Sequence, residues 1–190
     1  MKKLTLYLAG SIQKGHEPNE SEWTQKDINI LESVLKDVQI LNPAFRQDDL
    51  SDQKSVFGRD MLQVFLADAL FVDARHRRGL GVGAEMMWAK FLHKPVVTLA
   101  PVNTHYNKSE TSLLGVKIQD YIHPFIYNLS DHIALSIEDG ALFLKGHFEI
   151  KGKIKGIRDV EEAMRYYRDH QFLHDNPMKE LFSSDLLNEI

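Results

Sequence analysis

Glu85 occupies the position of this sequence best suited to covalent chemistry. It ends the stretch GlyLeuGlyValGlyAlaGlu, residues 79–85, which follows an apolar run and precedes a helical pattern over residues 86–92. Glycines at every second position let a ligand approach the backbone closely, and the first free N–H groups of the helix point toward the same place. A carboxylate there is either a hydrogen-bonding anchor or a nucleophile.

Two other carboxylates and one tyrosine are candidates for the same site. Asp60 lies in the amphipathic run 56–67, Asp73 ends the next apolar run, and Tyr7 lies in the first apolar run. Glycosyl transfer through an oxocarbenium-like transition state uses one carboxylate as nucleophile and a second group as acid or orienting residue. Each candidate also has a structural explanation. Glu85 can favour a helix dipole, Asp60 can be a solvated helix residue, and Asp73 can be a turn acceptor, while Tyr7 can pack in the core.

The motifs and the composition argue against other chemistries. The glycine stretch lacks the lysine of a nucleoside-triphosphate loop, and the first apolar run is followed by GlySerIleGlnLysGly, not by the GxGxxG of a dinucleotide site. The chain has no cysteine and no HExxH motif, so we expect no disulfide, no thiolate and no metal. We also expect no cofactor.

Charge and hydropathy limit the partners. The 190 residues carry a net charge of −4, which argues against binding a nucleic-acid polymer. No stretch approaches the roughly 20 apolar residues of a membrane span, and the apolar run after the first lysines is too short for a signal peptide. We therefore expect a cytoplasmic protein that does not bind membranes, with one domain as the simplest arrangement for this length.

Strand-like and helical patterns alternate in the first half of the chain. Strands are expected at residues 4–9, 38–43, 69–74 and 95–100, with helices at residues 22–36, 56–67 and 86–93. This alternation predicts an α/β fold with a doubly wound parallel sheet. Ligands of such sheets bind outside the carboxyl ends of the strands, where Ser11, Asp73 and residues 79–85 fall.

The patterns weaken after Pro101. A fifth strand is expected around residues 121–126, a small hairpin over residues 142–150, and a helix over residues 159–170. We divide the chain into an α/β domain, residues 1–127, and a C-terminal extension, residues 128–190, which packs on that domain or completes it.

Three ordered motifs resemble one known family. They are TyrLeuAlaGlySerIle at residues 7–12, GlyArgAspMetLeuGlnValPheLeuAlaAspAlaLeuPheValAsp at residues 58–73, and LeuGlyValGlyAlaGlu at residues 80–85. Together they resemble the nucleoside 2-deoxyribosyltransferase superfamily, and within it most closely the 2′-deoxynucleoside 5′-phosphate N-hydrolases, over residues 4–101. The resemblance implies a flavodoxin-like fold with about five strands, a homodimer or larger homo-oligomer, and cleavage of an N-glycosidic bond.

The resemblance also implies roles for single residues. Glu85 matches the nucleophile that forms a covalent glycosyl intermediate, Asp60 the aspartate that assists departure of the base, and Tyr7 the tyrosine that positions the glutamate and the sugar. Substrate contacts are expected from Gly10, Ser11, Ile12, Gln13, Lys14, Asp73, Gly79, Gly81, Gly83 and Ser112, the last one from a neighbouring subunit.

Two departures from the family pattern concern the phosphate. Gly79 stands where the N-hydrolases have a phosphate-binding serine, and Gln13 stands where their first loop has an arginine. Two alternatives stay open: Lys14 with Arg77 or Arg78 provides new phosphate contacts, or the substrate has no phosphate. The basic run 75–78 can also be a solvated loop.

We predict an enzyme that releases the base from a nucleoside or nucleoside 5′-monophosphate by hydrolysis. A deoxyribosyltransferase that exchanges bases is one alternative, because both reactions share the covalent step. A non-catalytic nucleotide-sensing module, in which Glu85 binds ribose hydroxyls, is another. A third is a partner-binding protein that acts through its C-terminal part.

Overall fold

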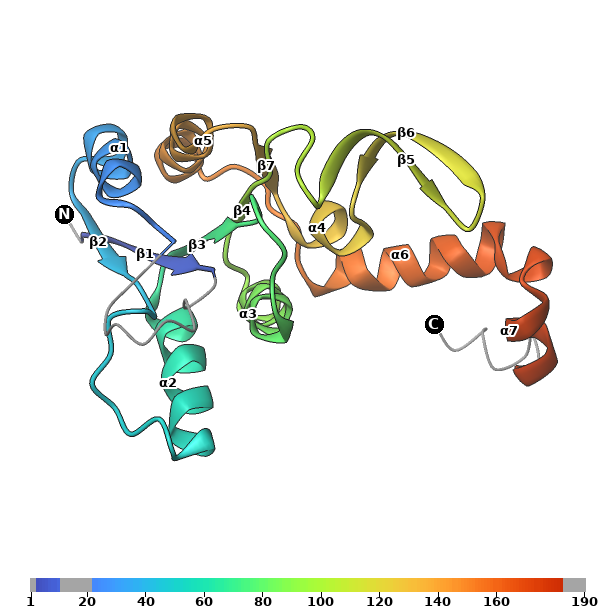
Figure 1. Ribbon diagram of the computed structural model, residues 1–190, viewed down its shortest axis with the longest axis horizontal. Coiled ribbons are helices and arrows are strands. Elements are labelled where there is room, and N and C mark those ends of the chain that lie inside the picture. Colours follow the sequence, from blue (N-terminus) through green and yellow to red (C-terminus); the bar gives the residue numbers. More distant parts are fainter. Residues whose placement is uncertain (1–2, 11–21, 183–190) are drawn as a thin grey trace.

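A five-stranded parallel sheet forms the centre of the molecule (Figure 1). The computed structural model describes residues 3–10 and 22–182. The strand order is β2-β1-β3-β4-β7, with β1 at Leu4–Ala9, β2 at Val38–Leu41, β3 at Ala69–Asp73, β4 at Val96–Leu99 and β7 at His132–Ala134. This architecture confirms the predicted α/β class and is consistent with a flavodoxin-like fold that carries a C-terminal helical extension.

Helices cover both faces of the sheet (Figure 1). α1 (Gln25–Leu35) and α5 (Ile137–Ile150) pack on one face, and α2 (Gln53–Leu66) and α3 (Leu80–Phe91) pack on the other. Successive residues of a strand point to opposite faces, so neighbouring positions of β1 and β3 belong to two different cores. Both faces are buried, which explains why these strands are continuously apolar in the sequence.

Side chains cap three of the four helices that flank the sheet. Thr24, Asp52 and Ser136 each accept a hydrogen bond from the backbone N–H three residues later, at 3.2, 3.1 and 3.1 Å. α3 differs, because its N-cap residue is Gly79, which offers no side chain. The first N–H groups of α3 therefore have no side-chain cap at the carboxyl edge of the sheet.

The sequence-based prediction is wrong at two places after β4. Residues 121–126 do not form the fifth strand: they fall in the end of β6 and the start of α4. β5 (Asn107–Leu113) and β6 (Val116–Ile122) form an antiparallel hairpin outside the main sheet, and α4 (Pro124–Leu129) leads into β7. The hairpin expected over residues 142–150 is instead part of α5.

A close helix-to-sheet contact explains the second error. Gly140 lies just before the predicted hairpin and Gly146 lies within it, but both are inside α5. A Cβ atom on Gly140 would lie 2.4 Å from Cζ of Phe71 and 2.8 Å from Cγ1 of Val97. Glycine at position 140 therefore lets α5 approach β3 and β4 closely, which is a packing role that local sequence does not reveal.

The last part of the chain extends away from the sheet (Figure 1). It consists of α6 (Ile157–His170), a short 3₁₀ helix, η1 (Phe172–His174), and α7 (Asn176–Leu181). The helix predicted over residues 159–170 is confirmed. Within residues 3–10 and 22–182, no helix has both the length and the apolar character that crossing a membrane requires.

Candidate active site

Tyr7 and Glu85 form the centre of the candidate site. Tyr7 lies on β1, and its hydroxyl donates a hydrogen bond of 2.8 Å to Oε1 of Glu85 on α3. The Tyr7 side chain is completely buried, and Glu85 is only 7% exposed. Two residues that are 78 positions apart in the chain, and that the motifs singled out independently, therefore meet in space.

Glu85 lies deeper in the helix than its sequence motif suggests. The third helix was expected over residues 86–93, but α3 already begins at Leu80, so the expected start is wrong. Buried Val82 and Met86, one helical turn apart, fix the inner face of the helix. Glu85 therefore lies in the second turn beside the core, and its interaction with Tyr7 explains its position better than a helix dipole does.

The glycines of the motif leave the outer surface of the first turn bare. A Cβ atom on Gly79, Gly81 or Gly83 would have no neighbour within 4 Å. None of the three has a positive φ, so no backbone constraint requires glycine there. Open space above free helix N–H groups is compatible with close approach of a polar ligand.

Burial shifts the ionisation of both central groups. Removal from water raises the pKa of Glu85 to about 7, with the Tyr7 hydrogen bond opposing this change and the negative charge of Asp60 adding to it. Burial and the adjacent Glu85 also raise the pKa of Tyr7. Oε2 of Glu85 is buried and has no hydrogen-bond partner among the described residues. Glu85 is thus a carboxylate with one oxygen positioned by Tyr7 and the other not engaged by any described residue.

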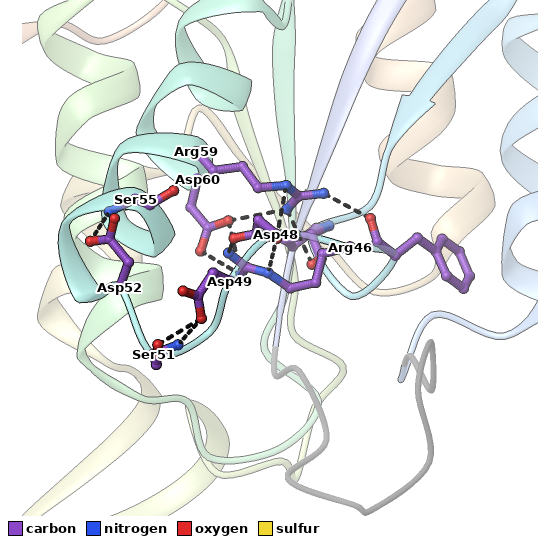
Figure 2. Close-up of polar contacts among 10 residues, drawn as sticks. Arg46, Asp48, Asp49, Ser51, Asp52, Ser55, Arg59 and Asp60 are labelled. Atoms are coloured by element: carbon purple, nitrogen blue, oxygen red, sulfur yellow. Dashed lines mark hydrogen bonds and ion pairs between the residues drawn. The ribbon is translucent and has the colours of Figure 1, made fainter.

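Asp60 is part of a charged cluster next to this pair. It lies on α2 and is bound by two arginines at 3.4 Å, through Nη1 of Arg46 and Nη1 of Arg59 (Figure 2). Burial raises the pKa of Asp60 and the two guanidinium groups oppose that rise. Its charge acts on Glu85 and on Tyr7, so Asp60 is not an ordinary solvated helix residue.

Asp73 lies in a separate ion-pair cluster. Its carboxylate is completely buried and contacts Nη2 of Arg75 and Nη2 of Arg78, both at 3.0 Å. The Arg75 backbone N–H and Nε also donate to it. Arg75 reaches Asp27 and Arg78 reaches Glu22 as well. These contacts fix the end of β3 relative to the start of α1, which is a structural role.

The ion pairs of Arg78 are relevant to the prediction that Arg77 or Arg78 binds a phosphate. The Arg78 side chain is only 4% exposed and is paired with two carboxylates, whereas Arg77 is exposed. Ser11, Ile12, Gln13 and Lys14 lie outside the described residues. Gly10 is partly buried, and a Cβ atom there would lie 3.2 Å from Nε1 of Trp23. Ser112 is exposed on β5 of the hairpin.

Sequence reasoning missed Arg46 and Arg59 completely. The only available signal was the alternation of opposite charges at positions 46, 48, 59 and 60, within a region interpreted as a polar loop and a helix. No group of three histidine, aspartate or glutamate side chains in the described part of the chain is arranged to hold a metal ion. His170 and His174 have HxxxH spacing, but they do not belong to any such group.

Replacing Tyr7 with phenylalanine is expected to raise the pKa of Glu85 further above its present value of about 7. The Tyr7 hydrogen bond is the contact that stabilises the ionised carboxylate, and its loss leaves desolvation unopposed. The measurement is a ¹³C NMR titration of the glutamate side chains, with Glu85 assigned from a Glu85→Gln variant. An unchanged or lowered pKa would contradict this account of the pair.

No protein-family model matches the chain, and a comparison with curated proteins gives no match either.

Proposed function

We propose that the protein is an N-glycosidase that releases the base from a nucleoside or nucleoside 5′-monophosphate. One observation carries the proposal: Glu85 is a buried carboxylate with one oxygen hydrogen-bonded to Tyr7, and its other oxygen has no hydrogen-bond partner among residues 3–10 and 22–182. A nucleophilic carboxylate needs such an arrangement, because a positioned but weakly solvated oxygen is reactive toward an electron-poor carbon. The bare first turn of α3 leaves room for the sugar.

The reaction follows from these contacts. An oxygen of Glu85 bonds to the anomeric carbon, while the C–N bond breaks and its electron pair leaves with the base, which takes up a proton. The negative charge of Asp60 assists this departure by stabilising the positive charge that develops on the sugar, and the proton on the base comes from solvent. Water then attacks the glycosyl ester, so that the sugar gains a hydroxyl, Glu85 returns as a carboxylate, and one proton is released. Tyr7 keeps the other oxygen of Glu85 in place throughout.

The ionisation of Glu85 predicts the pH dependence. Only the carboxylate form can attack, and its pKa of about 7 means that roughly half of the molecules are active at neutral pH. We expect the rate of base release to rise about tenfold from pH 6 to pH 8 and then to level off. A rate–pH profile measured on the best substrate tests this. A rate that is flat from pH 5 to pH 8 would exclude Glu85 as the titrating nucleophile.

The decisive experiment is a chromatographic screen of base release. Purine and pyrimidine nucleosides and their 5′-monophosphates, with ribose or 2-deoxyribose, are incubated with the protein. Each is tested with and without a second free base. Release without an acceptor identifies a hydrolase, and a new nucleoside that forms only with the acceptor identifies a transferase. Binding without any base release would instead favour a nucleotide-sensing module and contradict the proposal.

We further infer that the protein forms a homodimer through the exposed side of α2 and α3. Large apolar side chains on these helices are more than half exposed: Phe57, Leu62, Phe65, Leu66 and Phe91. At about 100 Å² for each, they expose roughly 500 Å², most of the roughly 800 Å² that each partner contributes to a standard interface. An exposed apolar area of this size often marks an interaction site.

A second copy is the partner that this surface fits best. A groove of about 510 Å³ between α2 and α3 is lined by Phe57, Met61, Ala84, Met87, Trp88, Phe91 and Ile157. Ala84 and Met61 are the chain neighbours of Glu85 and Asp60, so this groove lies on the two helices that carry the site. Light scattering is expected to give twice the 21.9 kDa of the chain, and Phe65→Asp to give the monomer. A monomeric wild type would contradict this.

A further inference from the structure

The loop between β2 and α2, residues 42–52, contains a buried guanidinium group. The Arg46 side chain is only 6% exposed, although its neighbours Phe45 and Gln47 are exposed. Arginine is almost never buried unless it is paired. A loop residue that turns inward in this way is held by specific contacts, and Figure 2 shows that these contacts lead to Asp60.

Arg46 bridges two carboxylates. Its Nε and Nη2 donate to the two oxygens of Asp48 at 2.8 and 2.5 Å, which is the bidentate geometry of a strong charge-assisted pair. Its remaining terminal nitrogen, Nη1, faces both oxygens of Asp60 at 3.4 Å. Asp48 therefore fixes the plane of the guanidinium group, and this group in turn faces the Asp60 carboxylate.

Arg59 ties the same loop to α2. Its Nη2 donates to the backbone oxygen of Phe45 at 2.7 Å, and its Nη1 donates to the backbone oxygen of Pro43 and to Asp60, both at 3.4 Å. Two backbone oxygens that precede Arg46 in the loop, those of Pro43 and Phe45, are thus anchored to the helix that carries Asp60. The loop cannot move away from α2 without breaking these bonds.

The four charged groups balance one another. Arg46 and Arg59 carry two positive charges, and Asp48 and Asp60 carry two negative charges. Glu85 and Tyr7 are the titratable groups that Asp60 influences from α3 and β1. The cluster can therefore keep a carboxylate ionised next to Glu85 without adding a large net charge to the site.

We propose that Arg46 is a positioning residue that holds the Asp60 carboxylate in one orientation beside Glu85. Asp48 fixes Arg46, and Arg59 fixes the loop that carries both. The inference rests on the proposed function, in which Asp60 assists departure of the base. It adds a group of residues outside the Tyr7–Glu85 pair that sets the ionisation and the orientation of the Asp60 carboxylate.

The test compares Arg46→Met with Arg46→Lys, which keeps the charge but not the bidentate geometry. Arg165→Met is the matched control, because Arg165 forms an exposed pair with Glu161 on α6. Asp60 is followed by ¹³C NMR of its carboxyl carbon, assigned by comparison with Asp60→Asn. In Arg46→Met the Asp60 carboxylate is expected to titrate at higher pH, because its proton affinity should increase at least tenfold. In Arg46→Lys the increase should be smaller.

The kinetic expectation is a split between kcat and KM. Arg46→Met should lower kcat for base release on the order of tenfold while KM changes less than twofold, with partial recovery in Arg46→Lys and no change in Arg165→Met. An Asp60 titration that stays in place in a folded Arg46 variant overturns the inference, and so does a normal kcat. If Arg46→Met does not fold, Arg46→Lys alone decides by the same two criteria.

The two proposals can fail separately. If the wild type releases no base from any substrate, the proposed enzymatic function is wrong. The NMR titration needs no substrate and still shows whether Arg46 controls Asp60. If base is released but the titration is unaffected by the Arg46 substitutions, the function stands and the positioning role is overturned.

Discussion

A Glu85→Gln variant is expected to release base on the order of 10³-fold more slowly than the wild type. Glutamine preserves the size of the side chain and can still accept the hydrogen bond from Tyr7, but its amide cannot form the glycosyl ester. The loss should appear in kcat with every substrate that the wild type accepts. Glu149→Gln, an exposed position on α5, is the matched control and should retain full activity.

The same variant is expected to be more stable than the wild type at pH 8. The unfolded chain releases the Glu85 proton near the ordinary value of 4.5, whereas the folded protein holds it to about pH 7. Folding therefore becomes less favourable as the pH rises from 4.5 to 7, by up to about 3 kcal/mol. Glutamine does not ionise, so the Glu85→Gln variant does not lose this free energy of unfolding. The buried N–H groups of the amide offset part of the resulting increase in stability.

Urea unfolding at pH 4 and pH 8 checks this second expectation. The free energy of unfolding of Glu85→Gln should exceed that of the wild type by roughly 1–3 kcal/mol at pH 8, and the advantage should disappear at pH 4. A functional group that costs stability is the usual signature of an active site. A variant that is inactive and also less stable at pH 8 would point to a structural role for Glu85.

The largest loss of stability is expected from Lys90→Met on α3. The Lys90 side chain is 1% exposed and contacts Asp131, which is 2% exposed. Lys90 also donates to the backbone oxygens of Lys94 at 3.2 Å and Lys155 at 3.3 Å. Methionine would leave Asp131 buried without its counter-ion, which costs about 3–5 kcal/mol. Equilibrium unfolding in urea measures the difference, and Lys145→Met at an exposed position is the control.

The loss of stability in Lys90→Met should be greatest where the C-terminal arm, residues 155–182, joins the core. Asp131 accepts hydrogen bonds from the backbone N–H groups of Val96 at 2.7 Å and Lys155 at 2.6 Å. Hydrogen exchange over residues 155–170 is therefore expected to accelerate more in Lys90→Met than exchange over β1 and β3. A double variant, Lys90→Met with Asp131→Asn, should recover part of the stability. Equal stability of the Lys90→Met variant and the wild type would show that the pair contributes nothing.

The parts of the fold that the sequence predicted are those with continuous local patterns. β1 and β3 are apolar at nearly every position and are bounded by glycine or aspartate, so their place was clear. β7 has only three residues, HisIleAla, and is a strand only because β4 offers it an edge. Gly140 could not be recognised as a packing glycine without knowing that Phe71 lies beneath it.

Prediction of the site from sequence was limited in the same way, because contacts between distant residues were not visible. Tyr7, Asp60 and Glu85 were found through motifs, and the structure brings Tyr7 and Glu85 together. Arg46 lies in a polar loop, where sequence indicates only solvation, and its importance depends on a contact with Asp60 on the following helix. Asp73 resembled a site residue because it ends a strand, but the arginines that bind it follow in a run that resembled a solvated loop.

The late position of β7 and α5 in the chain has a consequence for biosynthesis. Residues 100–131 emerge from the ribosome between β4 and β7, and during that interval α5 does not yet cover the face of the sheet that it shares with α1. The open edge of β4 and the uncovered side chains of Phe71 and Val97 can pair with other chains. Completion of α5 at Ile150 ends this exposure. We therefore expect the nascent chain to be most prone to pairing with other chains in the interval before α5 is complete.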